Sequence, residues 1–126
     1  MLSLRPFRAS AIALGLGLCS IAVVATAVDM PEMDLKGDAA AGKLVAEDSG
    51  KGNCLACHMI VGAESPGAIG PALIAMQTRY PSKEALARQI WDATVKAPEA
   101  AMPPFGKYEI LTDQEFADVV EYIWTL

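Results

Sequence analysis

The sequence predicts an all-α domain with about three main helices. Three segments repeat apolar residues at helical spacing, and no segment of useful length alternates apolar and polar residues as a β-strand would. Two long connections, residues 49–73 and 96–111, are rich in Gly or Pro. Because unstructured connections of that length are uncommon in compact domains, we expect a non-protein group to fill the interior and organise them.

The first predicted helix is AAAGKLVAED, residues 39–48, and Asp38 is placed to cap its N-terminus. The preceding residues, 28–37, are interpreted as a loose N-terminal arm. The second predicted helix covers residues 81–96, with Ser82 as its N-cap and Pro98 close to its end. One face of this helix is expected to present Leu86, Ala87, Ile90, Trp91 and Thr94.

The third predicted helix ends the chain, in TDQEFADVVEYIWTL. Thr112 and Glu115 have the spacing of a capping box, in which each side chain bonds the backbone N–H of the other residue. The apolar face repeats at helical intervals and consists of Phe116, Val119, Val120, Ile123 and Trp124.

Residues 1–27 have the features of a secretory signal peptide, with cleavage expected after Ala27. Arg5 and Arg8 form the basic start, and residues 9–25 carry no charge. A retained membrane anchor is the alternative, because residues 9–28 are just long enough to span a bilayer. The domain is then residues 28–126, and no stable membrane insertion is expected after cleavage.

The composition excludes some classes of function. The chain has 10 basic and 15 acidic residues, for a net charge of −5, and loss of Arg5 and Arg8 with the signal would make it −7. No basic stripe is present, so nucleic acid is not an expected partner. A domain of this size has a thin apolar core, which a metal or cofactor often supplements.

The stretch KGNCLACH holds Cys54, Cys57 and the only histidine, His58. A structural zinc site needs four ligands, and no other Cys or His remains in residues 28–126. A dithiol redox switch usually follows a β-strand, which is missing here, and it would leave His58 without a role.

Covalent haem accounts for all three residues. On a helical turn Cys54 and Cys57 face the same way, so each thiol can add to one vinyl group of a porphyrin. His58 then brings its imidazole to the iron, and Cys-x-x-Cys-His is the attachment signature of c-type haem. We therefore predict one covalently attached haem c, with its Cys, His and Met ligands around a cavity.

Methionine is the natural second axial ligand, because no second histidine exists. Met102 in AMPPFG is favoured, since two prolines stiffen its loop, and Met76 is the alternative. Met59 adjoins His58 and cannot reach the opposite face. The other candidates, Met30 and Met33, fall in the predicted arm.

Other side chains are expected to support the site. A ligating histidine normally donates its second ring N–H to a carbonyl or carboxylate, and the carbonyl of Pro71 is the candidate here. Trp91, Phe105 and Tyr108 are expected to pack in the cofactor crevice. His/Met iron has no open coordination position, so the predicted function is one-electron transfer, with no catalytic residue on this chain.

The whole pattern resembles the class I cytochromes c: an early helix with Gly42, the Cys-x-x-Cys-His site, Gly-Pro-x-Leu, a methionine loop and an aromatic C-terminal helix. GAESPGAIGPAL and MPPFG are the more specific stretches, and they resemble SoxX, the small haem subunit of SoxAX thiosulfate-oxidising complexes. This resemblance implies a class I cytochrome c-like fold, with about three main helices around the haem.

The same resemblance implies a periplasmic location and a heterodimer with a SoxA-like haem subunit. That complex is similar to an L-cysteine S-thiosulfotransferase, which joins thiosulfate to a cysteine of a SoxYZ-like carrier. The resemblance places the catalytic centre on SoxA, and this chain would pass electrons to a soluble cytochrome c. A free diffusible periplasmic cytochrome c is the alternative function.

Overall fold

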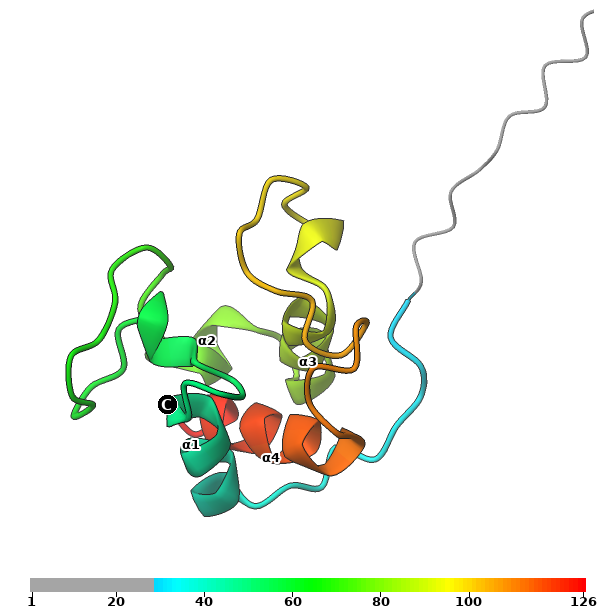
Figure 1. Ribbon diagram of the computed structural model, residues 1–126. Coiled ribbons are helices and arrows are strands. Elements are labelled where there is room, and N and C mark those ends of the chain that lie inside the picture. The colour runs from blue at the N-terminus through cyan, green and yellow to red at the C-terminus, as the bar shows by residue number, and fades with distance from the viewer. Residues whose placement is uncertain (1–28) are drawn as a thin grey trace, which may run out of the picture.

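The computed structural model describes residues 29–126, so the expected signal peptide lies outside the described residues. Its helices are α1 (Ala39–Glu47), α2 (Met76–Arg79), α3 (Lys83–Trp91) and α4 (Asp113–Trp124), with 3-10 turns at Cys54–Ala56 and Ala93–Val95. Within this part of the chain the only β-type pairing is an isolated parallel bridge between Ile60 and Leu73. The prediction of an all-α fold is confirmed (Figure 1).

The three predicted helix starts are where the capping residues place them. Asp38 accepts hydrogen bonds from the N–H groups of the first turn of α1, at 2.7 and 3.1 Å. Ser82 accepts one from the first turn of α3, and Thr112 and Glu115 form the reciprocal capping box of α4. Such caps satisfy backbone donors that have no partner inside the helix, and each is worth about 1 kcal/mol.

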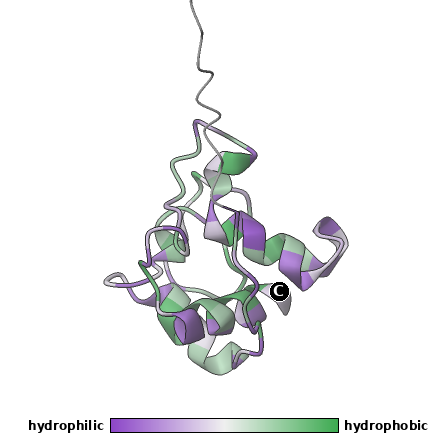
Figure 2. Cartoon of the chain, turned by 90° about the vertical axis from the view of Figure 1, so that its right-hand side faces the viewer, coloured by the Kyte–Doolittle hydropathy of each residue, from purple (hydrophilic) through white to green (hydrophobic). Residues whose placement is uncertain are grey.

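The core is centred on α4, which packs against α1 on one side and α3 on another (Figure 1). The helices carry hydrophobic and hydrophilic residues on different sides, as amphipathic helices do (Figure 2). Gly42 lets α1 approach α4 at backbone distance, because a Cβ at this position would lie 1.9 Å from the carbonyl oxygen of Asp118. The predicted apolar face of α4 is buried except for Trp124, which is half-buried.

The second predicted helix is shorter than expected. It was predicted over residues 81–96, but α3 ends at Trp91 and Asp92 is extended, with φ −153° and ψ 96°. The Asp92 side chain accepts a hydrogen bond from the N–H of Thr94 and so starts a separate 3-10 turn. Asp commonly caps in this way, which competes with continuation of the helix.

The N-terminal arm is not loose along its described part. Met30 is 9% exposed and belongs to the hydrophobic core. Asp29 pairs with Arg88 of α3 at 2.5 Å, and Gly37 passes so close to α4 that a Cβ would lie 2.2 Å from the carbonyl oxygen of Ala117. The arm is therefore packed by contacts with distant segments, which local periodicity does not reveal.

None of the helices in residues 29–126 combines the length and the hydropathy needed to cross a membrane.

Candidate cofactor site

A cavity of about 600 Å³ lies between five segments. They are the cysteine turn, defined as residues 54–58, the helices α2, α3 and α4, and the Met102 loop, defined as residues 96–112. This volume is within the usual range of about 300–1,000 Å³ for small-molecule and cofactor sites. Cys54, Cys57, His58 and Met102 all line it. The remaining wall is mainly apolar and includes Leu73, Met76, Leu86, Ile90, Phe105, Leu111, Val119 and Ile123.

The cysteine turn is built onto the C-terminal end of α1. Gly52 donates its N–H to the carbonyl of Val45 at 3.1 Å, and a Cβ there would lie 2.7 Å from that same oxygen. Asn53 then adopts a left-handed conformation with φ 47°, which asparagine tolerates better than most residues. This reversal starts the 3-10 turn at Cys54 and directs the turn to the cavity.

Both cysteines are half-buried free thiols. The N–H groups of Cys57 and His58 both bond the carbonyl of Cys54, at 3.2 and 2.9 Å, so the turn holds the three residues together. Burial raises the pKa of the Cys54 thiol to about 11, which keeps it protonated at neutral pH. Cys54 therefore lacks the thiolate character of an activated redox cysteine.

The imidazole of His58 is held from one edge. Its Nδ1 lies 2.7 Å from the carbonyl oxygen of Pro71. A carbonyl can only accept, so Nδ1 carries the proton and Nε2 of the neutral ring keeps its lone pair. Nε2 is thus the ring atom available to a metal ion.

The segment that contains Pro71 is fixed to the cysteine turn by backbone hydrogen bonds. The N–H groups of Gly67 and Gly70 donate to the carbonyls of Leu55 and Cys57, each at 2.7 Å. Leu73 continues the pairing by donating to the carbonyl of Met59 at 2.8 Å. The two segments therefore form one rigid unit around the histidine.

Two of the thioethers considered as ligands line the cavity, those of Met102 and Met76. Met102 is half-buried in the Pro-rich loop, on a wall contributed by a different segment from that of His58. Met76 is 2% exposed, and its sulfur lies 3.6 Å from the guanidinium Nη1 of Arg79. Met30 and Met33 line a separate hollow beside the arm, and Met59 is 45% exposed.

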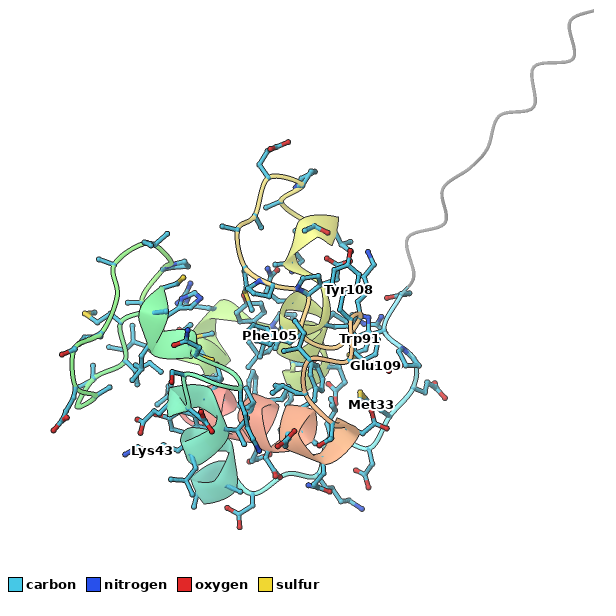
Figure 3. All side chains as sticks on the ribbon, viewed as in Figure 1. Met33, Lys43, Trp91, Phe105, Tyr108 and Glu109 are labelled. Atoms are coloured by element: carbon cyan, nitrogen blue, oxygen red, sulfur yellow. The ribbon has the colours of Figure 1, made fainter. Side chains whose placement is uncertain are left out.

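Of the three aromatic residues expected in the crevice, only Phe105 lines the cavity. Trp91 and Tyr108 lie on the side of α3 that faces the arm (Figure 3). Trp91 instead packs edge-on against Phe116, with ring centroids 5.7 Å apart, and Tyr108 is 67% exposed. The expectation for these two residues is wrong. The 3.6-residue period does not fix the direction of the Trp91 side chain at the last position of α3, and Tyr108 lies outside the helices, where no periodicity applies.

The charged side chains of the cavity wall are both cationic, and each already has a partner: Lys51 pairs with Glu115, and Arg79 donates to the carbonyl of Ala72 at 2.6 Å. Lys51 and Arg79 are the charged side chains that line the cavity among the described residues, and no Asp or Glu does. The sequence analysis predicted neither cation at the site. The spacing of Arg79 from Met76, three residues on one short helix, is the signal that could have placed Arg79 beside the cavity. The mainly apolar wall fits a flat apolar macrocycle better than a bare metal ion.

A zinc site is disfavoured by the donor set. Across residues 29–126 no three His, Cys, Asp or Glu side chains converge on one point. Two thiols, one imidazole and a thioether around an apolar cavity instead suit a porphyrin iron.

Helices around an apolar cavity, with two thiols and an imidazole on one turn, define the class of proteins that attach haem covalently. The family model for cytochrome c matches residues 39–126, and the chain belongs to the cytochrome c family. It is a cytochrome c electron-transfer protein, and this domain implies covalently bound haem c.

Among solved structures, the chain is similar to one in the "Crystal structure of SoxXA from P. pantotrophus", with 26% sequence identity and a TM-score of 0.63. The match covers 71% of this chain and 81% of that chain. No curated protein sequence matches significantly. The predicted class I cytochrome c fold and the resemblance to SoxX are confirmed by the family and structure matches.

Proposed function

We propose that this chain is the periplasmic electron-transfer subunit of a SoxAX-type thiosulfate-oxidising complex, with one haem c. The observation that carries the proposal is the geometry of His58. Its Nδ1 is hydrogen-bonded to the carbonyl of Pro71, which leaves the lone pair of Nε2 for a metal ion. The histidine lines the same cavity as Cys54, Cys57 and Met102. The likeness to a chain of SoxXA supports the choice of complex.

In this proposal Cys54 and Cys57 would hold the haem covalently, and His58 and Met102 would supply the nitrogen and sulfur that bind its iron. The bound haem supplies a one-electron ferric/ferrous couple. The carbonyl of Pro71 keeps the His58 tautomer and raises the basicity of the ligating nitrogen. The Met102 thioether favours the ferrous state, and apolar side chains such as Leu86, Ile90 and Val119 exclude water from the macrocycle.

With both His58 and Met102 bound, the iron would have no open position for a substrate, so this chain would carry electrons and perform no bond chemistry. The oxidation occurs on a SoxA-like partner, where the thiolate of a SoxYZ-like carrier cysteine and thiosulfate form an S–S bond. That coupling releases two electrons, which this chain accepts one at a time and passes to a soluble cytochrome c. The periplasmic location rests on export by the signal peptide of residues 1–27.

Two experiments on the native protein test this proposal. Purification from the periplasm followed by haem staining should recover a second, larger haem polypeptide with this chain. Elution of the chain alone near its own mass would favour the free diffusible cytochrome instead. A pyridine haemochrome spectrum of the purified chain should indicate two thioether links and one haem per polypeptide.

The axial ligand is tested by a matched pair of substitutions at the two methionines that line the cavity. Met102→Ala should abolish the near-infrared sulfur-to-iron band of the ferric protein, and Met76→Ala should keep it. The opposite result would assign the ligand to Met76, which was the alternative at the sequence level.

A further inference from the structure

The Met102 loop has little regular structure of its own, so other contacts must fix the position of its methionine. Pro103 and Pro104 restrict the backbone next to Met102, but they do not attach the loop to the rest of the protein. The attachment lies a few residues further on, where Gly106 and Lys107 meet the end of α3.

An ion pair joins the loop to α3. Asp92 is 2% exposed, and its Oδ2 lies 2.6 Å from the Nζ of Lys107. Its Oδ1 accepts from both the N–H and the hydroxyl of Thr94, at 3.0 and 2.5 Å. Every oxygen of this buried carboxylate therefore has a partner, and within residues 29–126 Lys107 is the cation that pairs with it.

Packing and a backbone bond act at the same place. The indole of Trp91 covers Gly106 so closely that a Cβ would lie 1.9 Å from its Cε3 atom, and only glycine fits beneath it. Lys107 donates its N–H to the carbonyl of Trp91 at 3.3 Å. The indole is in turn held by its edge-on contact with Phe116 of α4, at an interplanar angle of 84°.

The position of Gly106 and Lys107 is transmitted towards Met102 through a short, stiff path. The N–H of Tyr108 bonds the carbonyl of Pro104 at 3.1 Å, and that of Ile110 bonds the carbonyl of Phe105 at 3.0 Å. These two bonds fold residues 104–110 into one unit. Only Pro103 separates this unit from Met102 along the chain.

We propose that Trp91, Asp92, Gly106 and Lys107 form a clamp that positions Met102 towards the cavity and keeps its thioether from leaving the iron. The inference rests on the proposed role of Met102 as axial ligand. The clamp residues are positioning residues, since none of the four lines the cavity.

The experiment compares Lys107→Met with Lys83→Met in the purified, haem-loaded protein. Lys83 pairs with Glu121 between α3 and α4, with 27% of its side chain exposed against 30% for Lys107, so it controls for loss of an ion pair elsewhere on α3. The readouts are the near-infrared sulfur-to-iron band and the rate at which imidazole displaces the methionine of the ferric protein.

Lys107→Met should speed imidazole binding by about tenfold or more, because the clamp opens and leaves Asp92 unpaired. It should also weaken the near-infrared band, and Lys83→Met should change neither readout. Lys107→Arg, which keeps the charge, should restore the wild-type rate. Equal acceleration by Lys83→Met and Lys107→Met, or no acceleration by Lys107→Met, would overturn the clamp.

Failure of the clamp is distinguishable from failure of the ligand assignment. If Met102→Ala keeps the near-infrared band, the proposed ligand is wrong and the clamp is rejected with it. If Met102→Ala loses the band while Lys107→Met behaves as wild type, the ligand stands and only the clamp is rejected. Should Lys107→Met not accumulate with haem, the nearly isosteric Asp92→Asn is measured and judged by the same rate criterion.

Discussion

Gly70 lies directly against the imidazole ring of His58. A Cβ built at Gly70 would be 2.5 Å from Cε1 and 2.7 Å from Nδ1 of the ring. The same ring is tied to the carbonyl of Pro71, so it cannot shift without losing that hydrogen bond. The glycine is therefore required by the orientation of the histidine.

Gly70→Ala should disturb the proposed haem ligation through His58. Overpacking of this kind costs about 1–3 kcal/mol, and here it acts on the ring that the iron would bind. We expect a lower yield of haem-loaded protein and a weaker low-spin Soret spectrum than in the wild type. Gly50→Ala is the control, because Gly50 also lines the cavity but the nearest contact of an added Cβ is a side-chain atom, the Asp48 carboxylate oxygen, at 3.3 Å. An unchanged spectrum in Gly70→Ala would contradict this account.

Gly42→Ala should destabilise the packing of α1 on α4. Alanine favours a helix over glycine by about 1 kcal/mol, but the added Cβ would lie 1.9 Å from the backbone carbonyl of Asp118. Because backbone cannot rotate away, the clash should win, and the free energy of unfolding should fall by about 2 kcal/mol. Urea unfolding measures this change. A more stable Gly42→Ala protein would mean that the helices can separate without cost.

The ion pair of Asp92 predicts an acid limb in stability. The hydrogen bond from Lys107, followed by that from Thr94, holds the pKa of Asp92 below its ordinary value of 3.8. A carboxyl with a lowered pKa stabilises the fold above its ordinary pKa, and this contribution is lost as the pH falls through the folded value.

The pH profile of Asp92→Asn follows from that sign. The difference in free energy of unfolding between wild type and Asp92→Asn should be constant from about pH 5 to neutral and should shrink below about pH 4. The raised pKa of Lys107 keeps the pair intact on the alkaline side up to pH values above 10.5. Thermal unfolding across this range measures the difference, and a difference that grows on acidification would refute the assignment.

An exposed apolar segment next to the cavity is expected to contact the SoxA-like partner of the proposed function. Val61 and Ile69 are 73% and 80% exposed, and Ile69 also lines the cavity. Ile69→Asp should weaken binding of the partner by about tenfold, because it would replace an apolar contact with a charge. The matched control is Leu44→Asp on α1, where the leucine is 72% exposed and does not line the cavity. Equal affinities of the two variants in a titration with the partner would place the interface elsewhere.

The helix starts could be predicted because their signals are local. Asp38, Ser82 and Thr112 each bond N–H groups within three residues, so the sequence pattern contains both partners. The cysteine turn was predictable for the same reason, since Cys54 and His58 are joined by a bond of the turn itself.

Features that depend on distant partners could not be predicted in this way. The end of α3 is set partly by Lys107, fifteen residues away from Asp92. The arm is ordered by Arg88 and by the backbone of α4, neither of which has any sequence relation to residues 29–37. Trp91 was expected in the cavity and shares a predicted apolar face with Ile90, but its ring packs against Gly106 of a distant loop instead.

The crossing of α1 and α4 has a consequence for how the haem is captured. All four residues proposed to hold the haem lie between these two helices in the sequence. The contact of α1 with α4 therefore brings together the two ends of a loop formed by residues 48–112. Bringing the ends of such a loop together is an entropic cost that grows only slowly with its length. Once α1 and α4 have packed together, haem binding orders a loop whose two ends are already fixed. A chain cut within residues 48–112 keeps α1 on one fragment and α4 on the other, so the two fragments should still associate through these helices.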